Sequence, residues 1–254
     1  MRTDLPPGGA DAVRATVGHL VEVHERTIDD DGLDAWRDHA EVVVAGERLV
    51  VRPPWVPIDL DALPPDPVIV SIDPARSWGH GAHPTTRLCL AEVERACRER
   101  VGMSVVDLGC GSGVLGIAAA RLGATHVHAY DTDPAAVAAT LDNARRNQVH
   151  DRVDAHQVPD PAEPLADLVG HHDLIVANIG AAALVGLART ILDHVGNDGE
   201  VVLSGLLDPV DPAVLAAVDP WRAVRSTTLD GWVAIVLRSP HVLPPGLVPH
   251  TSER

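Results

Sequence analysis

The sequence predicts a doubly wound α/β protein with a mainly parallel seven-stranded sheet and an antiparallel C-terminal edge. Between Val68 and Arg238, short apolar runs alternate with longer amphipathic stretches, which is the pattern of strand–helix repeats in a parallel sheet. Near the end of this region, two strand-like runs flank Asp230-Gly231, a dipeptide typical of a tight hairpin turn. The last two strands are therefore expected to pair antiparallel.

The expected elements follow the hydrophobic pattern in chain order. Residues 42–52 indicate a hairpin, because Val/Leu runs flank a turn at Ala45-Gly46-Glu47. The expected sheet strands are Val105–Leu108, His126–Tyr130, Val153–Val158, Leu174–Ala177, Val201–Leu203, Ala223–Leu229 and Val233–Leu237. The expected helices between them are Val114–Leu122, Pro134–Asn147, Ala162–Val169 and Ala181–Val195. Asp133 precedes a proline at a helix start, so we expect it to cap that helix.

Prolines divide the chain into four regions. Six prolines between Pro53 and Pro67 indicate an extended linker. We expect a short N-terminal region that is a small α+β remnant, a linker with the strand that leads out of it, a main α/β domain and a disordered tail. The corresponding boundaries are residues 1–57, 58–75, 76–238 and 239–254.

Composition and charge exclude several classes of function. The formal net charge is −16 at pH 7 and Lys is absent, which disfavours direct nucleic-acid binding. No apolar stretch approaches the roughly 20 residues of a membrane span, and the first residues lack the apolar core of a secretory signal. Three cysteines, Cys89, Cys97 and Cys110, cannot all pair and fit no zinc spacing. We therefore expect a cytoplasmic protein with free thiols and no membrane partner.

Histidine pairs raise the question of a metal site. They are His80-x-x-His83, His126-x-His128 and His171-His172. None of these pairs has a carboxylate or a thiolate at a fitting spacing in the sequence. We therefore expect no metal site.

The strongest local signal is the glycine-rich run Val105-Val106-Asp107-Leu108-Gly109-Cys110-Gly111-Ser112-Gly113. A buried strand leads into alternating glycines and then into an alanine-rich helix. Glycines let the backbone approach a ligand closely and present amide groups at the start of that helix. Asp131 ends the next strand, where a carboxylate can accept hydrogen bonds from ribose hydroxyls.

Two cofactors fit this layout. Residues 111–116 satisfy the GxGxxG pattern, with Asp131 where NAD needs an acid, so an NAD-dependent oxidoreductase is one alternative. S-adenosylmethionine (SAM) fits better, because an acid at the strand tip followed by alternating glycines resembles motif I of class I SAM methyltransferases. The carboxylate of Asp107 suits the amino group of SAM, whereas it would repel a pyrophosphate.

Further motifs, in chain order, resemble the ribosomal protein L-eleven methyltransferase family. Residues 78–90, WGHGAHPTTRLCL, resemble that family's FGTGxHxTTxLCL signature. Residues that resemble its other motifs are 46–55, 111–119, 122–124, 131–134, 177–179, 203–207 and 231–233. The resemblance covers roughly residues 33–238. Family members carry a full α+β recognition domain ahead of this stretch, so we expect a shortened remnant here.

This resemblance implies a Rossmann-like class I methyltransferase that uses SAM. The positions that match the family's SAM-contacting residues are Thr86, Gly109, Asp131 and Asn178. The loop pattern adds Asp107 and Gly111 as candidate SAM-binding residues. Asn178 is also the candidate for aligning the methyl acceptor, because ligands of doubly wound sheets bind at the carboxyl ends of the strands.

The implied activity is methyl transfer to amino groups of a protein, lysine or α-amino, with a ribosomal large-subunit protein as the target. The sulfonium of SAM is already activated, so the enzyme mainly aligns the acceptor behind the methyl group. Carbonyls near Asn178-Ile179 could orient the lone pair of an amine. Methylation of another protein or of a small molecule, and SAM binding without turnover, stay open as alternatives. The number of methyl groups transferred and the oligomeric state are open as well.

Overall fold

The computed structural model describes residues 40–74, 79, 81–158, 168 and 170–240. The chain divides into two compact units, residues 1–40 and 41–254, and all described residues except Ala40 belong to the second. The helix expected at Ala162–Val169 lies outside the described residues apart from Leu168, as does most of the tail expected at 239–254. Across the described ranges, no helix combines the length and the apolar character that crossing a membrane requires.

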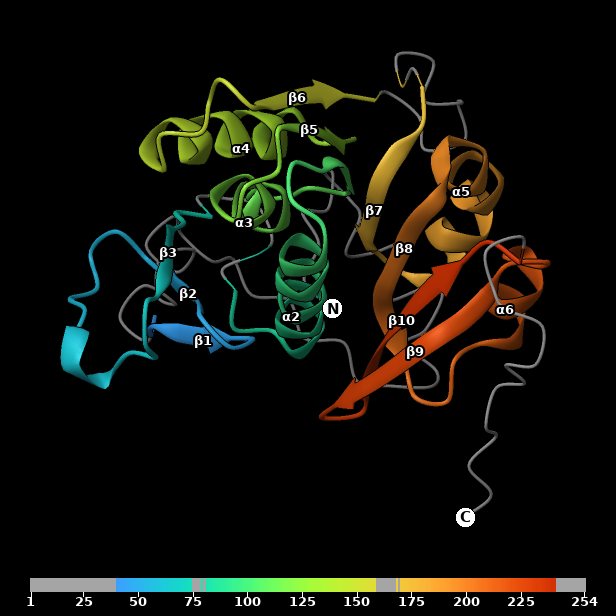
Figure 1. Cartoon of the computed structure of the whole chain (residues 1–254), viewed down its shortest axis with the longest axis horizontal. Coiled ribbons are helices and arrows are strands. Elements are labelled where there is room, and N and C mark those ends of the chain that lie inside the picture. Colours follow the sequence, from blue (N-terminus) through green and yellow to red (C-terminus); the bar gives the residue numbers. More distant parts are fainter. Residues whose placement is uncertain (1–39, 75–78, 80, 159–167, 169, 241–254) are drawn as a thin grey trace, which may run out of the picture. The chain divides into compact units, whose positions relative to one another are not determined.

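A seven-stranded sheet forms the centre of residues 41–254 (Figure 1). Its strand order is β6-β5-β4-β7-β8-β10-β9. The strands are β4 (Ser104–Leu108), β5 (His126–Asp131), β6 (Val153–Gln157), β7 (His172–Asn178), β8 (Val195–Leu207), β9 (Arg222–Leu229) and β10 (Trp232–Arg238). Strands β4 to β8 pair in parallel, whereas β10 pairs antiparallel with both β8 and β9. The predicted doubly wound sheet with an antiparallel edge is confirmed.

Helices cover both faces of this sheet (Figure 1). Helices α2 (Pro84–Glu99), α3 (Val114–Arg121) and α4 (Pro134–Arg146) cover one face, and α5 (Ala181–His194) and α6 (Pro212–Ala217) cover the other. Successive side chains of a strand point to opposite faces, so Val105 packs in the α2–α3 core while Val106 packs in the α5 core. The two cores hold the sheet as a rigid platform between them.

Proline fixes the first turn of three helices. Helices α2, α4 and α6 each begin with proline, whose missing N–H is not needed there and whose φ suits the helix. Asp133 caps α4 as the sequence predicts, because its carboxylate accepts a hydrogen bond from the Ala135 amide at 2.8 Å. Asp211 caps α6 in the same way. These local signals determine the residue at which each of the three helices begins.

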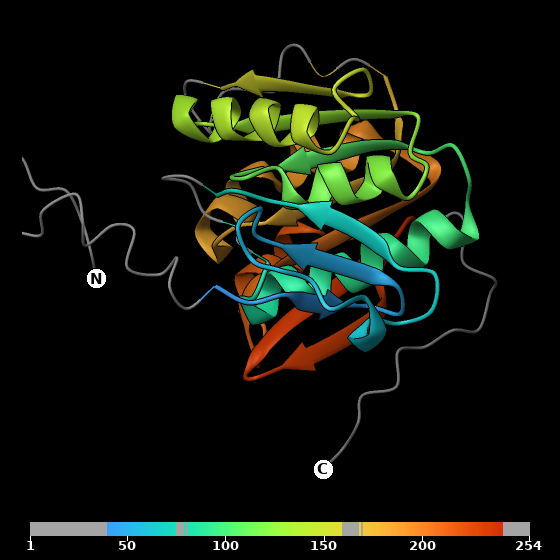
Figure 2. The same cartoon turned by 90° about the vertical axis from the view of Figure 1, so that its left-hand side faces the viewer.

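The N-terminal part of the described chain forms a separate three-stranded sheet, in blue to cyan in Figure 2. Strands β1 (Val43–Ala45) and β2 (Leu49–Arg52) form the predicted hairpin. Strand β3 (Val68–Ser71) pairs in parallel with β2, so it belongs to this small sheet rather than to the main one. The proline-rich linker between them contains a 3₁₀ turn, η3 (Leu60–Ala62).

A carboxylate of α2 holds the small sheet in place. Both oxygens of Glu94 accept hydrogen bonds from the hairpin, one from the Glu47 amide at 2.6 Å and one from the Arg48 amide at 2.9 Å. Apolar side chains of β2 and β3 join the same core as α2 and α3. The small sheet therefore forms one packed body with the helices on that face.

Strand β8 is longer than predicted. It runs over thirteen residues, Val195–Leu207, whereas the apolar pattern indicated only Val201–Leu203. Its first half contains the polar run Gly196-Asn197-Asp198-Gly199-Glu200, which carries no strand periodicity. The register with β7 shifts in this half, so pairing with a neighbouring strand, and not side-chain pattern, makes it a strand.

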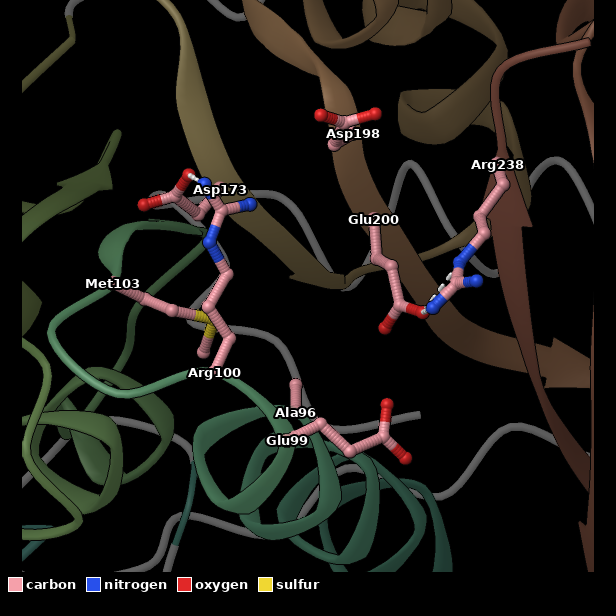
Figure 3. Close-up of a pocket in the computed structure, with 8 residues that line it drawn as sticks. All are labelled: Ala96, Glu99, Arg100, Met103, Asp173, Asp198, Glu200 and Arg238. Atoms are coloured by element: carbon pink, nitrogen blue, oxygen red, sulfur yellow. Dashed lines mark hydrogen bonds and ion pairs between the residues drawn. The ribbon is translucent and has the colours of Figure 1, made fainter. Parts of the chain in front are cut away.

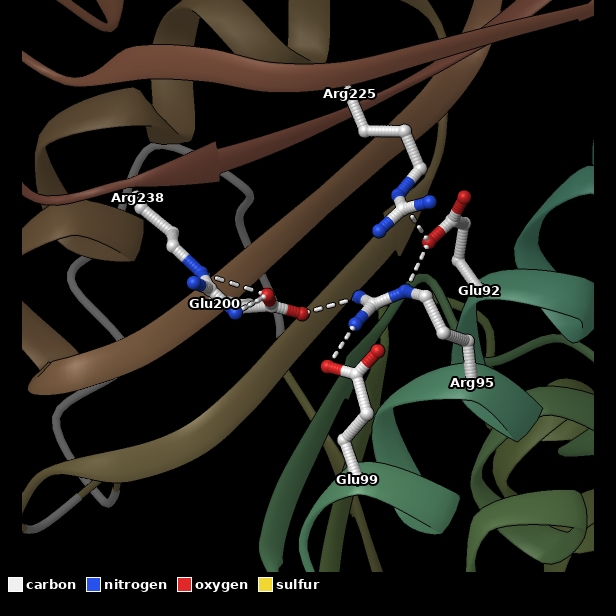
Figure 4. Close-up of polar contacts among 6 residues, drawn as sticks. All are labelled: Glu92, Arg95, Glu99, Glu200, Arg225 and Arg238. Atoms are coloured by element: carbon white, nitrogen blue, oxygen red, sulfur yellow. Dashed lines mark hydrogen bonds and ion pairs between the residues drawn. The ribbon is translucent and has the colours of Figure 1, made fainter. Parts of the chain in front are cut away.

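Ion pairs link α2 to the antiparallel edge of the sheet (Figure 4). The guanidinium of Arg95 on α2 bonds to Glu92, to Glu99 and to Glu200 of β8. Glu200 also pairs with Arg238 of β10, and Glu92 lies 3.5 Å from Arg225 of β9. The charges buried here are all paired, which is the condition under which charged groups are tolerated inside a protein.

Candidate active site

The loop after β4 adopts a backbone that suits glycine. Gly109, Gly111 and Gly113 have φ angles of 71°, 55° and 79°. A Cβ added at Gly109 would fall well under 3.0 Å from the Ile179 side chain, and one at Gly113 would fall 2.8 Å from Thr140. The amides of Gly109 and of the next residue donate to the Tyr130 carbonyl of β5, at 2.8 and 3.0 Å. The loop is thus narrow, and β5 fixes its start.

Asp131 holds the same loop from the end of β5. Its Oδ2 accepts a hydrogen bond from the Gly111 amide at 2.9 Å, and its Oδ1 accepts one from the Asp133 amide at 3.0 Å. The side chain is partly exposed. Each carboxylate oxygen has a second lone pair, so Asp131 can accept further hydrogen bonds from ligand hydroxyls.

Asn178 at the end of β7 meets Thr86 in the first turn of α2. The Asn178 Nδ2 donates a hydrogen bond to the Thr86 Oγ1 at 3.3 Å, although the two residues lie 92 positions apart. Thr86 is buried, whereas Asn178 is partly exposed. The contact joins the tip of the central strand to the helix that follows residues 79–83.

Asp107 lies beneath the glycine loop. It is fully buried, and its Oδ2 accepts a hydrogen bond from the Gly116 amide of α3 at 2.9 Å. Its Oδ1 is buried with no hydrogen-bond partner among the described residues. Burial raises the pKa of Asp107 to about 7, and the nearby charge of Asp131 adds to this shift. This geometry anchors α3 to β4; contact of Asp107 with the cofactor stays a prediction.

The candidate residues form two groups at the carboxyl ends of the parallel strands. Gly109, Gly111 and Asp131 make the first group, and Thr86 with Asn178 makes the second. Ile179 connects them, since it follows Asn178 directly and an added Cβ at Gly109 would strike its side chain. Strands β4, β5 and β7 all end here, which is where parallel sheets place their ligands.

Helix α4 supports the loop with polar side chains that the sequence analysis missed. The Thr140 Oγ1 donates to the Gly111 carbonyl at 3.1 Å, and the Asn143 Nδ2 donates to the Ser112 carbonyl at 3.0 Å. The Ser112 Oγ donates to the Gly79 carbonyl at 2.6 Å. The sequence did contain a signal for these contacts, because Thr140 and Asn143 place polar groups on one face of an otherwise alanine-rich helix.

Two asparagines on this face also hold the chain that continues β3. The side-chain amide of Asn147 both accepts from the Ser71 amide at 2.8 Å and donates to the Ser71 carbonyl at 2.7 Å. Asn143 makes the same pair of bonds with Asp73, at 3.0 and 2.8 Å. Each asparagine side chain makes the pair of backbone hydrogen bonds that a neighbouring strand would otherwise make. The end of β3 and the residues after it are therefore fixed beside the glycine loop.

His83 takes a structural position at the start of α2. It caps α2, with its Nδ1 2.8 Å from the Thr85 Oγ1. Its ring packs edge-to-face on Trp232 of β10, with ring centroids 5.0 Å apart. Its partner in the sequence pattern, His80, lies outside the described residues.

A cavity of about 200 Å³ lies near the amino ends of the parallel strands, away from the glycine loop (Figure 3). Met103, just before β4, and Asp173, near the start of β7, contribute to its wall. Four of its charged side chains are paired with one another, Arg100 with Asp173 at 2.7 Å and Arg238 with Glu200, and Glu99 pairs with Arg95. We therefore place the ligand site at the glycine loop and not in this cavity.

The site fits a cofactor that contains a ribose. Three alternating glycines with positive φ angles let the loop pack closely against Ile179 and Thr140, and Asp131 supplies free lone pairs next to the loop. The crystal structure of ribosomal protein L11 methylase from Lactobacillus delbrueckii subsp. bulgaricus is similar to this chain, with a TM-score of 0.65 and 29% identity over 77% of this chain and 97% of that one. The fold and the site define a class I SAM-dependent methyltransferase.

The chain belongs to the ribosomal protein L11 methyltransferase family, whose model matches residues 12–240. A ribosomal protein L11 methyltransferase from Aeromonas hydrophila is 40% identical over 84% of this chain and 68% of that protein. One from Methylococcus capsulatus is 42% identical over 79% of this chain and 65% of that protein. The chain therefore spans about two thirds of the length of these relatives.

The buried Asp107 predicts a specific pH dependence of stability. Its pKa of about 7 in the folded chain lies above the ordinary value of 3.8, so the unfolded chain releases this proton first. The free energy of unfolding should fall, relative to Asp107→Asn, as the pH rises from about 4 to about 7. The full difference corresponds to about 4 kcal/mol. Asparagine keeps an acceptor for the Gly116 amide.

Urea unfolding of both proteins between pH 4.5 and 8 checks this expectation. Burial lowers the pKa of His172 to about 4, so stability from that group is lost as the pH falls below its ordinary value of 6.5. This opposite trend is common to wild type and variant, and it cancels in their difference. A difference that does not change with pH would contradict the assignment of a perturbed carboxyl to Asp107.

Proposed function

We propose that this chain transfers methyl groups from SAM to amino groups of ribosomal protein L11. The observation that carries the proposal is the meeting of two groups at the carboxyl ends of the parallel strands, the glycine loop with Asp131 and the Thr86–Asn178 pair. The acceptor is inferred from the names of the relatives. We place the activity in residues 76–238 and in the cytoplasm, a compartment that suits three buried free cysteines.

In this proposal the chain's own residues bind and orient the donor. Asp131 accepts hydrogen bonds from the ribose, while the backbone at Gly109 and Gly111 lies along the methionine part. Thr86 and Asn178 close the other side. When bound, SAM supplies a methyl group on a positively charged sulfur that leaves readily. The protein therefore needs alignment more than acid–base catalysis.

Asn178 is the residue we assign to aligning the acceptor. Its Nδ2 is engaged by Thr86, and among the described residues this is the hydrogen bond that involves its side-chain amide. The Oδ1 can accept a hydrogen bond from an N–H of a deprotonated amine. Such a bond holds the amine while its lone pair stays free for the methyl group.

Methyl-labelled SAM, the purified chain and purified ribosomal protein L11 test this function. We expect label in L11 and one S-adenosylhomocysteine for each methyl group transferred. Asn178→Ala should lower kcat more than it weakens SAM binding, because the acceptor loses its alignment. Binding of SAM is measured in parallel by titration calorimetry.

Three outcomes that would contradict this function can be told apart by the same measurements. Turnover with fractions of a cell lysate that lack L11, and none with L11, would assign another protein or a small molecule as the acceptor. Binding of SAM without S-adenosylhomocysteine formation with any fraction would indicate a binding protein. Absence of SAM binding would contradict the cofactor site itself.

A further inference from the structure

Two histidines and one aspartate meet on the sheet face that α5 also covers. His126 and His128 lie two residues apart on β5, so their side chains leave the same face of the sheet. Asp154 of β6 lies directly opposite His128 in the strand pairing. One ligand atom from each of the three side chains lies within 4.8 Å of the other two. Strand pairing thus supplies the carboxylate that the sequence pattern around His126-x-His128 lacks.

We propose that His126, His128 and Asp154 bind a divalent transition-metal ion, with Zn²⁺ as the best match. Imidazole nitrogen and carboxylate oxygen are both zinc ligands, at about 2.0–2.2 Å from the ion. In a tetrahedral site these distances separate ligand atoms by about 3.3 Å. Ligand atoms that lie up to 4.8 Å apart must therefore approach by up to about 1.5 Å, which rotation of the partly exposed His126 and the exposed Asp154 side chains allows. Water takes the fourth position.

Pairwise contacts account for only part of this arrangement. The His126 Nε2 lies 3.2 Å from the Asp154 Oδ2, which is an ordinary ion pair or hydrogen bond. That contact does not require His128, whose ring packs edge-to-face on His126 with centroids 4.3 Å apart. An ion shared by all three side chains explains why two imidazoles gather at one carboxylate.

A second observation comes from β7, further into the sheet. The ring of His172 packs edge-to-face on His128, with centroids 5.3 Å apart. His172 is buried, its Nδ1 lies 2.7 Å from the Ser104 Oγ, and its Nε2 has no hydrogen-bond partner among the described residues. His156 of β6 instead stacks on Tyr130, with centroids 5.4 Å apart. The imidazole cluster around the three proposed ligands therefore extends to a buried histidine with an unpartnered ring nitrogen.

The proposed ion lies away from the methyl-transfer site. His126 begins β5 and Asp131 ends it, so the two ends of the strand are separated by about 16 Å at 3.3 Å per residue. An ion at His126 joins β5 to β6, and all three side chains hold it together only in the folded chain. It should therefore raise stability without taking part in the reaction.

Cobalt and zinc binding to the full chain without a histidine tag test the proposal. We expect one equivalent of Co²⁺ to give visible d–d absorption bands of tetrahedral type, and Zn²⁺ to displace it. Zn²⁺ should also raise the melting temperature. His128→Ala and Asp154→Asn should each weaken Co²⁺ binding by at least about tenfold. His150→Ala, an exposed histidine just before β6, is the matched control and should bind as wild type does.

His126→Gln keeps the size of the side chain and serves as a second ligand variant. Circular dichroism of each metal-free variant establishes that it is folded before binding is compared. Absence of stoichiometric Co²⁺ binding to the wild type would overturn the proposal. Equal binding by the wild type and the folded ligand variants would also overturn it, because the ion would then lie elsewhere.

Discussion

Asp131→Ala is expected to weaken SAM binding by about ten- to hundred-fold while the chain stays folded. A hydrogen bond to a charged group contributes about 1.5–3 kcal/mol, which corresponds to that range of affinity. The carboxylate also accepts hydrogen bonds from the Gly111 and Asp133 amides. Its removal therefore costs both a ligand contact and the support of the glycine loop.

A second variant separates these two contributions. Asp131→Asn keeps one acceptor oxygen for the Gly111 amide but removes the negative charge, so it should lose affinity for SAM while unligated stability falls less than in Asp131→Ala. Asp142→Ala is the matched control, because Asp142 is an exposed acid on α4 paired with Arg145 at 2.7 Å. Calorimetric titration with SAM and thermal unfolding without ligand measure the two effects. An unchanged dissociation constant for Asp131→Ala, with normal unligated melting, would remove Asp131 from the site.

Elements marked by local signals could be predicted from the sequence. The hairpin at β1 and β2 follows from apolar runs around a glycine, and the start of α4 follows from Asp133 before a proline. The pairing of β3 with β2 could not be predicted, because the proline-rich linker between them hides which sheet β3 joins. The first half of β8 is polar and becomes a strand through its neighbours. Local sequence signals therefore predict which elements form, whereas pairing between distant segments determines which sheet a strand joins and how long it is.

The candidate site divides in the same way. The glycine loop and Asp131 belong to one strand–loop–helix–strand stretch, so their proximity follows from the pattern alone. The Thr86–Asn178 contact joins distant segments and could be expected only through the resemblance to a family. Thr140 bonds to the backbone of the loop, a partner that no side-chain pattern reveals. Likewise, Asp154 reaches His128 only through the pairing of two strands.

Gly205→Ala is expected to be far more destabilising than Gly231→Ala, although both glycines have similar positive φ angles, 84° and 77°. Nothing lies within 4 Å of a Cβ added at Gly231, so that variant loses only the cost of the left-handed backbone, about 1–2 kcal/mol. A Cβ at Gly205 would fall well under 3.0 Å from the Ile179 carbonyl oxygen. Backbone atoms cannot move aside as a flexible side chain can, so we expect a loss of at least about 4 kcal/mol.

Urea unfolding of the wild type and the two variants measures this difference. The clash also has a functional consequence, since Ile179 follows Asn178 and packs against the glycine at position 109. Folded Gly205→Ala protein must move the end of β7 away from β8, and it should therefore bind SAM more weakly than Gly231→Ala protein does. Equal stability of the two variants would mean that the chain after Asn178 does not lie against β8. The second group of the proposed site would then lose its support, whereas the glycine loop and Asp131 would keep theirs.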